Sequence, residues 1–211
     1  MTSGDVKADR KEPGPLRKKR ETEVLDAAAR VFSRRGYHGT STQDIAAELD
    51  IRQASLYYYF RSKEEALEQV CARGAEGFAE RASAISASDL SPREKLTALV
   101  EAHCLPLRKN AHFTITFLNE RKWLAGDSRK RVRNVSRKVE DIFEEVIRKG
   151  IADGVFRGDI DPRLATLAIL GMLNSVPHWY GSEPATLEDI QKALAVLACE
   201  GIVLRQEAKG A

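Results

Sequence analysis

The sequence predicts an all-α fold of about nine helices, and three observations carry this prediction. Apolar residues recur three and four positions apart over most of the 211-residue chain, which is the period of an amphipathic helix. No segment alternates apolar and polar residues for long enough to form a strand. Apolar residues make up 43% of the chain, which is enough for a packed core.

The first elements form a small N-terminal unit. Residues 1–15 are polar and rich in proline and glycine, so we expect a disordered arm there. A helix is expected over 17–35, with Gly36 as its left-handed cap. Two short helices follow at about 41–48 and 53–59. The apolar stripe of the first helix is Leu25, Ala28, Ala29 and Phe32.

Longer helices fill the rest of the chain. Residues 62–65, Ser-Lys-Glu-Glu, form a capping box that begins a helix to about Arg81. Pro92 begins the next helix, at a position where its missing N–H has no partner to lose. The remaining helical segments are expected over 111–124, from Asp127 or Ser128 to Gly150–Gly154, from Pro162 to about Ser175, and from Thr186 to Leu204.

Positive charge is concentrated at the front of the chain. Residues 1–63 carry 13 Lys and Arg against 9 Asp and Glu, whereas residues 64–211 carry 21 against 22. A basic unit joined to a neutral one suits a protein in which only the first part touches phosphate.

Several classes of function are disfavoured. The three cysteines are widely spaced and lack metal-ligand spacing, so we expect free thiols and no metal site. No apolar run reaches the roughly 20 residues of a membrane helix, and no hydrophobic signal core is present. We therefore expect a cytoplasmic protein that does not enter a membrane.

Neighbours on a helix do not face each other, so His103 and Cys104 make a poor catalytic pair. We expect no catalytic residues, no cofactor and no enzyme activity.

The segment from Thr40 to Phe60 carries the main functional signal. Ser41 can cap the first short helix together with Asp44, and Asp50 lies where the chain must turn sharply. Three consecutive tyrosines are hard to explain by packing, and a phenol can offer its hydroxyl to a phosphate oxygen. The pattern predicts two crossed short helices that present hydroxyls and amides to double-stranded DNA. The side chains expected to point outward are Gln53, Ser55, Tyr57 and Tyr58.

This segment resembles the DNA-binding domain of TetR-type repressors over about residues 17–68. The matching positions are Gly36-Tyr37, Thr40-Ser41, Ile45-Ala46, Leu56-Tyr57-Tyr58-Tyr59-Phe60 and Ser62-Lys63-Glu64. The resemblance implies a homodimeric repressor that a small ligand releases from DNA. We therefore expect a helix-turn-helix DNA-binding head over 16–62 and a ligand-binding and dimerisation body over 63–211, after the arm at 1–15.

The resemblance also implies which residues contact DNA. Expected phosphate contacts are Thr40, Tyr58, Tyr59 and Lys63. The expected base-facing set is Gln43, Arg52, Gln53, Ala54 and Ser55, and the predicted DNA site also includes Ser41 and Tyr57. Two positions depart from the family pattern, because Asp50 replaces the usual glycine of the turn and Arg52 replaces a serine. The operator sequence therefore cannot be taken from relatives.

Three of these interpretations have a structural alternative. Tyr57 can serve mainly to pack the head against the first helix. The basic stretch 17–20 can be a phosphate or minor-groove arm or a solvated helix start. The basic run 129–138 is more typical of a solvated helix face.

The body carries signs of a dimer and of a ligand. The helix around 164–173 is apolar on nearly all sides and the helix 190–204 is similarly rich, so we expect a four-helix interface with a second copy. Segment 171–180 resembles TetR-type regulators that respond to acyl-CoA thioesters. Expected ligand contacts, each with core packing as its alternative, are His103, Phe113, Phe117, Asn119, Trp123, Asn174, His178 and Trp179. Cations that could meet a CoA phosphate are Arg108, Lys109, Arg121 and Lys122.

Two functional hypotheses from other classes stay open beside the repressor. A ligand-independent DNA-binding or architectural protein would use the body for dimerisation alone and would lack a cavity. An enzyme would need a catalytic arrangement that the sequence does not supply.

Overall fold

The computed structural model describes residues 15–203 and confirms the all-α fold. Ten α-helices and one short 3-10 helix lie in this range, and its only β feature is an isolated bridge between Phe156 and Val203. The arm expected over residues 1–15 lies outside the described residues, except for Pro15, which begins the first helix.

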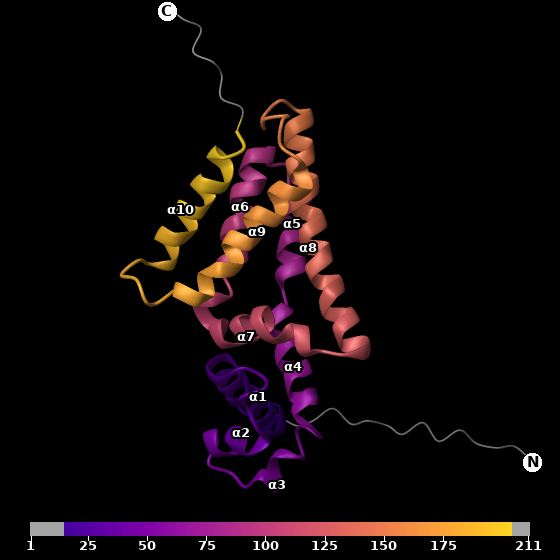
Figure 1. Ribbon diagram of the computed structural model, residues 1–211, viewed down its shortest axis with the longest axis vertical. Helices are drawn as coiled ribbons and strands as arrows, with labels where there is room; N and C mark the ends of the chain where they lie inside the picture. Colours follow the sequence, from indigo (N-terminus) through magenta and orange to yellow (C-terminus); the bar gives the residue numbers. More distant parts are fainter. Residues whose placement is uncertain (1–14, 204–211) are drawn as a thin grey trace, which may run out of the picture.

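The head occupies one end of the elongated molecule (Figure 1). It contains α1 (Pro15–Arg35), α2 (Thr42–Glu48) and α3 (Gln53–Leu56). The next helix, α4 (Lys63–Ala75), leads from the head towards the body (Figure 1).

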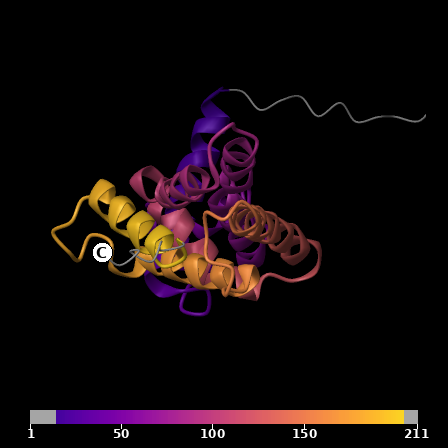
Figure 2. The ribbon, with the colours of Figure 1, turned by 90° about the horizontal axis from the view of Figure 1, so that it is seen from above.

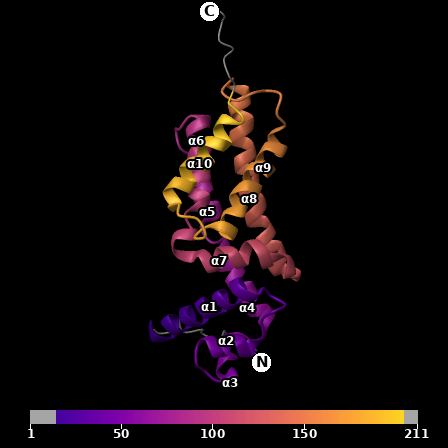
Figure 3. The ribbon, with the colours of Figure 1, turned by 60° about the vertical axis from the view of Figure 1, so that its left-hand side comes forward.

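The body is a bundle in which one helix lies crosswise. Helix α7 lies between the head and the upper helices (Figure 3). Helices α9 and α10 lie along the outside of the bundle when it is seen from above (Figure 2). The body elements are α5 (Phe78–Ser86), α6 (Pro92–Cys104), α7 (Leu107–Glu120), η1 (Arg121–Trp123), α8 (Gly126–Ala152), α9 (Pro162–Trp179) and α10 (Leu187–Glu200).

Helix boundaries differ from the prediction where local chemistry was misread. The helix expected over 62–81 is two helices, because the backbone is extended at Glu76 and Gly77 adopts φ 78°, a left-handed conformation that favours glycine. Helix α3 ends at Leu56, and the three tyrosines follow in a turn. Helix α9 continues past Ser175 to Trp179 despite Pro177. The predicted left-handed cap at Gly36 is confirmed, with φ 69°.

Two hydrophobic clusters hold the chain together. The larger cluster joins α5, α6, α8, α9 and α10 and includes Phe143, Leu173 and Leu96. The smaller cluster joins the head to α4, α7 and α8, and it includes Phe32 and Phe117. The head therefore shares its core with α7, so a movement of α7 displaces the side chains of α1 that pack against it.

The helices between residues 15 and 203 lack the combination of length and apolar character that a membrane crossing requires.

Candidate nucleic-acid interface and ligand cavity

The turn between α2 and α3 has the geometry of a helix-turn-helix. Ser41 caps α2: its Oγ accepts from the N–H of Asp44 (3.1 Å), and Asp44 Oδ2 accepts from the N–H of Ser41 (2.8 Å). Asp50 has φ 52°, which makes it the only described non-glycine residue in the left-handed region, as its place in the turn predicted. Arg52 precedes α3 without a side-chain cap. These features hold α3 across α2 with its N-terminus free.

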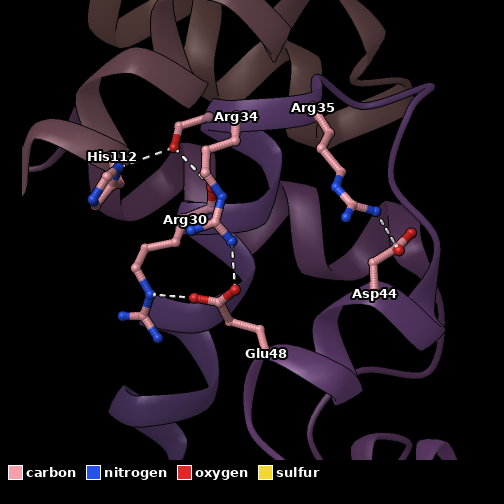
Figure 4. A network of polar contacts seen from close by, with 7 residues as sticks. Arg30, Arg34, Arg35, Asp44, Glu48 and His112 are labelled. Carbon is pink, nitrogen blue, oxygen red and sulfur yellow. Dashed lines mark hydrogen bonds and ion pairs between the residues drawn. The ribbon is translucent and has the colours of Figure 1, made fainter.

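Ion pairs between α1 and α2 fix the orientation of the motif. Glu48 accepts from Arg30 Nε (2.9 Å) and also pairs with Arg34, while Asp44 pairs with Arg35 (Figure 4). The hydrogen bonds from Arg30 and Arg34 lower the pKa of Glu48. Partly exposed pairs contribute little individually, about 0.2–1 kcal/mol, but together they restrict how α2 rotates on α1.

Most of the predicted DNA-contacting residues lie at one end of the head. Tyr58 is 86% exposed and Tyr57 is 50% exposed. Tyr57 is therefore largely outside the core, which disfavours the packing alternative. Gln53 donates through Nε2 to Thr42 Oγ1 (2.7 Å) and to Tyr57 Oη (3.3 Å), so its amide is preoriented beside the exposed ring. Also on this surface are Ser41, Gln43, Arg52 and Ala54, which are exposed, and Ser55, which is half-buried.

Three predicted phosphate contacts lie deeper than expected. Thr40 is 3% exposed and donates to the carbonyl of Gly36 (2.7 Å), so its hydroxyl is engaged within the head and offers little surface to a phosphate. Tyr59 is half-buried against the smaller cluster. Lys63 Nζ donates to the carbonyl of Tyr37 (3.1 Å) and lies 4.3 Å from the centre of that ring.

A cavity of about 220 Å³ lies in the body among α5, α6, α7, α8 and α9. Three predicted ligand residues, His103, Phe117 and Asn174, line it. His103 Nε2 donates to Asn174 Oδ1 (3.0 Å), and burial lowers the pKa of His103 to about 4. His103 is therefore neutral at pH 7, and it supplies a polar wall without a charge.

The other five predicted ligand residues do not line this cavity. Phe113 faces a polar groove of about 730 Å³ between α1, α4 and α7. Trp123 is 44% exposed and packs edge-on against His38 of the head, with ring centres 4.2 Å apart. Asn119 is half-buried elsewhere on α7, His178 is exposed, and Trp179 packs against the larger cluster. Helical spacing placed these residues in the body but could not show which face of each helix borders empty space.

Among the four cations suggested for a CoA phosphate, only Arg121 lines the cavity. Arg121 Nη1 donates to Ser136 Oγ (2.9 Å) and its guanidinium lies 5.0 Å from the centre of the Phe117 ring. Arg108 pairs with Glu188 at the surface. Lys109 and Lys122 are exposed.

The segment 120–123 joins the cavity to the head. Glu120 Oε2 accepts from the backbone N–H of Tyr37 (2.9 Å), immediately after α1. Its neighbour Arg121 reaches the cavity, and Trp123 contacts His38. We call residues 120–123 the joint segment. No feature of the sequence pointed to Glu120, because its partner is a main-chain group from a distant part of the chain.

Two further contacts tie α7 to the head. His112 Nδ1 and Ser33 Oγ are 3.0 Å apart (Figure 4). At Gly74, α4 crosses α7 so closely that an added Cβ atom would lie 2.7 Å from Cβ of Phe117. Helix α7 is thus held against both α1 and α4.

Exposed apolar side chains gather on α9 and α10. Leu164 is 66% exposed, Val196 is 59% exposed and Leu197 is 62% exposed, with Leu167 beside them on α9. Large apolar side chains exposed in this way are typical of an interaction face, and the sequence predicts a dimer interface on these two helices.

Metal binding has no obvious place between residues 15 and 203, where no group of three or more His, Cys, Asp or Glu is positioned to hold an ion. The cysteines Cys71, Cys104 and Cys199 are all buried as free thiols.

Comparison with known proteins places both parts of the chain. Residues 24–70 match the bacterial regulatory proteins of the tetR family, and residues 89–202 match the tetracyclin repressor-like C-terminal domain. The HTH-type transcriptional repressor KstR2 of Rhodococcus jostii (strain RHA1) is 28% identical over 187 residues, which cover 87% of this chain and 91% of that protein.

Two solved structures have the same fold. The ketosteroid transcriptional regulator KstR2 of Mycobacterium tuberculosis aligns with a TM-score of 0.82 and 26% identity, covering 88% of this chain and 96% of that chain. AibR in complex with isovaleryl coenzyme A and operator DNA aligns with a TM-score of 0.75 and 28% identity, covering 84% of this chain and 97% of that chain.

Proposed function

This chain belongs to the TetR family of bacterial regulatory proteins, and on that premise we propose that it is a dimeric transcriptional repressor released from its operator by a small molecule. The observation that carries the DNA-binding part is the exposed surface formed by α3 and the tyrosine turn, where Tyr58 is 86% exposed. A tyrosine so exposed gains nothing from packing, and its hydroxyl suits a phosphate oxygen. We expect the protein to act in the cytoplasm, where the chromosome lies.

Within this proposal the head, residues 16–62, reads DNA. Arg52 and Gln53 lie at the N-terminal end of α3, where side chains of a recognition helix reach base edges. Tyr57, Tyr58 and Lys63 supply the phosphate side, with Ser41, Gln43, Ala54 and Ser55 nearby. We leave Thr40 out of the contacting side chains because its hydroxyl is buried and bonded within the head.

The body, residues 63–211, supplies dimerisation and the response to ligand. The exposed leucines of α9 and α10 support a twofold interface with a second copy. The cavity supports a small-molecule ligand, and it disfavours the architectural alternative, which has no need of one. Because AibR is solved with isovaleryl coenzyme A, an acyl-CoA thioester is the first ligand class to test.

The joint segment supplies a route from ligand to DNA. A ligand that displaces Arg121 acts on the turn that also carries Glu120 and Trp123, and these two residues hold the head at Tyr37 and His38. A ligand changes DNA affinity only if it binds the two head arrangements with different affinity.

Selection of bound fragments from a random DNA pool, with and without isovaleryl coenzyme A, tests the proposal. We expect an inverted repeat to be enriched, mirroring the dimer, and its recovery to fall when the thioester is added. Recovery of no preferred sequence, even at low salt, would contradict the DNA-binding part. An enriched repeat that no acyl-CoA affects would remove only that ligand class.

A further inference from the structure

Arg81 on α5 carries a guanidinium whose inner atoms have no partner. Its Nε and Nη2 atoms are shielded from solvent and have no hydrogen-bond acceptor within residues 15–203. The guanidinium lies 5.3 Å from the centre of the Phe78 ring, a contact that satisfies none of its N–H donors. Shielding such a group from water without an acceptor is unfavourable, so its retention calls for an explanation.

Arg121 is a second partly buried arginine close to His103. It borders the cavity, and its hydrogen-bond partner there is the neutral hydroxyl of Ser136. Burial lowers the pKa of both Arg81 and Arg121. Glu140 is the only carboxylate among the residues that line the cavity, all of them in the described range, and it already accepts from Arg163 (2.6 Å).

Both arginines lie near His103, because Arg121 lines the cavity with it and Arg81 lines a smaller void with it. Phe78, His103 and Val139 line both the cavity and a smaller void of about 10 Å³, and Arg81 lines that void. A void of this size holds about one water-sized atom. His103 is neutral and hydrogen-bonded to Asn174, so it adds no compensating charge. Glu80 and Glu140 act electrostatically on Arg81 and Arg121, but within the described part of the chain neither carboxylate is hydrogen-bonded to these two guanidinium groups.

We propose that the effector carries an anionic oxygen group, a carboxylate or a phosphate, which binds at Arg121 and Arg81 while a short apolar part fills the cavity. This rests on the proposed ligand response and names the chemistry of the ligand. The cavity of about 220 Å³ has room for roughly seven non-hydrogen atoms. An anion at this position supplies an acceptor for the Nε and Nη2 atoms of Arg81, which have none, and a charged acceptor for Arg121, which now donates to a neutral hydroxyl.

Matched probes separate charge from shape and carboxylate from phosphate. Isovalerate and isovaleramide have the same size and differ in charge, while coenzyme A and isovaleryl coenzyme A bring phosphate. Calorimetry on the full chain should show at least tenfold tighter binding of isovalerate, or of one of the two coenzyme A compounds, than of the amide. Stronger binding by the acid assigns a carboxylate, and stronger binding by coenzyme A assigns a phosphate. The proposal is overturned if isovalerate and isovaleramide bind equally tightly and neither coenzyme A compound binds more tightly than the amide.

Variants test the arginines themselves. Arg121→Met and Arg81→Met should each weaken binding of the anion at least tenfold, whereas Arg93→Met, at an exposed ion pair with Glu200, should not. Without ligand, Arg81→Met should also raise the unfolding midpoint, because it removes a shielded charge that has no partner. A lowered midpoint would mean that Arg81 is structural and would overturn its role. This result does not depend on the folding of the Arg121 variant.

The two proposals fail differently. DNA selection on the same preparations reports on the repressor alone. If an operator is enriched but the acid and the amide bind equally, only the anion-site proposal is contradicted. If an anion binds tightly but no DNA sequence is preferred, only the repressor proposal is contradicted.

Discussion

Two arginines of the body, Arg81 and Arg121, differ from the arginines that hold the head together. In the head, Arg30, Arg34 and Arg35 on α1 each meet a carboxylate of α2 near the surface. In the body, Arg81 and Arg121 are half-buried, and their inner atoms meet only rings, a hydroxyl or nothing. Paired charges at a surface fix a geometry at low cost, whereas shielded charges without a partner destabilise the protein until a ligand arrives. The head is therefore built to keep its shape, and the body to respond.

The largest expected effect comes from breaking the body's apolar face. Leu197→Glu should place a charge in the dimer interface and abolish dimerisation. Operator affinity should then fall by about 100-fold or more, since two linked heads bind far more tightly than one. Analytical ultracentrifugation and gel shift measure both effects. Glu145→Lys, at an exposed position of α8, is the control and should leave the dimer intact. A dimeric Leu197→Glu protein would show that α10 is not the interface.

Acid should weaken the body through His103. Its pKa falls from 6.5 to about 4 on folding because of burial, so the unfolded chain takes up the proton first. The contribution of neutral His103 to the free energy of unfolding is therefore complete above pH 6.5. It decreases by about 3 kcal/mol as the pH falls towards 4. Denaturant unfolding at pH 7 and at pH 4.5 should show a smaller loss in His103→Gln than in the parent. If the free energy of unfolding decreases equally in the two proteins, His103 does not cause the loss of stability in acid.

In the head, Tyr58→Phe tests whether the hydroxyl of Tyr58 contacts a DNA phosphate. It removes one hydroxyl from a largely exposed position, so folding should be unaffected and affinity should fall about tenfold on every DNA sequence. Gln53→Ala is its counterpart and should change sequence preference instead. Gel shifts over a set of operator variants and salt concentrations distinguish the two patterns. A changed preference in Tyr58→Phe would contradict its assignment to phosphate.

The smallest expected effect lies in the scaffold of the head. Ser41→Ala removes the cap of α2 and should lower the free energy of unfolding by about 1 kcal/mol. Thermal unfolding measures this change. Ser182→Ala, at an exposed site in the loop between α9 and α10, provides the control and should have no effect. A neutral Ser41→Ala would mean that the ion pairs alone hold α2.

Prediction from sequence succeeded where the chemistry is local. The left-handed turn at Asp50, the cap at Gly36 and the capping box at Ser41 depend on residues within a few positions of each other, and all three were read correctly. The split at Gly77 was missed, because a glycine inside a helical pattern does not reveal its φ angle.

The cavity was predicted only in part, since it depends on packing between distant segments. His103 and Asn174 were both predicted as ligand contacts, and they do meet. Trp123 and His178 were also predicted as ligand contacts but lie at the surface. Arg81 gave no signal, because a cation on a helix reads as solvated until the helices packed around it are known.

The crossing at Gly74 sets the kind of motion that the head can make. Because Gly74 has no side chain, the backbone of α4 packs directly against Phe113 and Phe117 of α7, and the two helices separate only by losing this contact. We therefore expect a displacement of the joint segment to rotate α4 about this crossing. In such a rotation the displacement of a residue increases with its distance from the crossing. We therefore expect a small displacement near the ligand to move the tyrosine turn, at the far end of the head, more than any other part of the head.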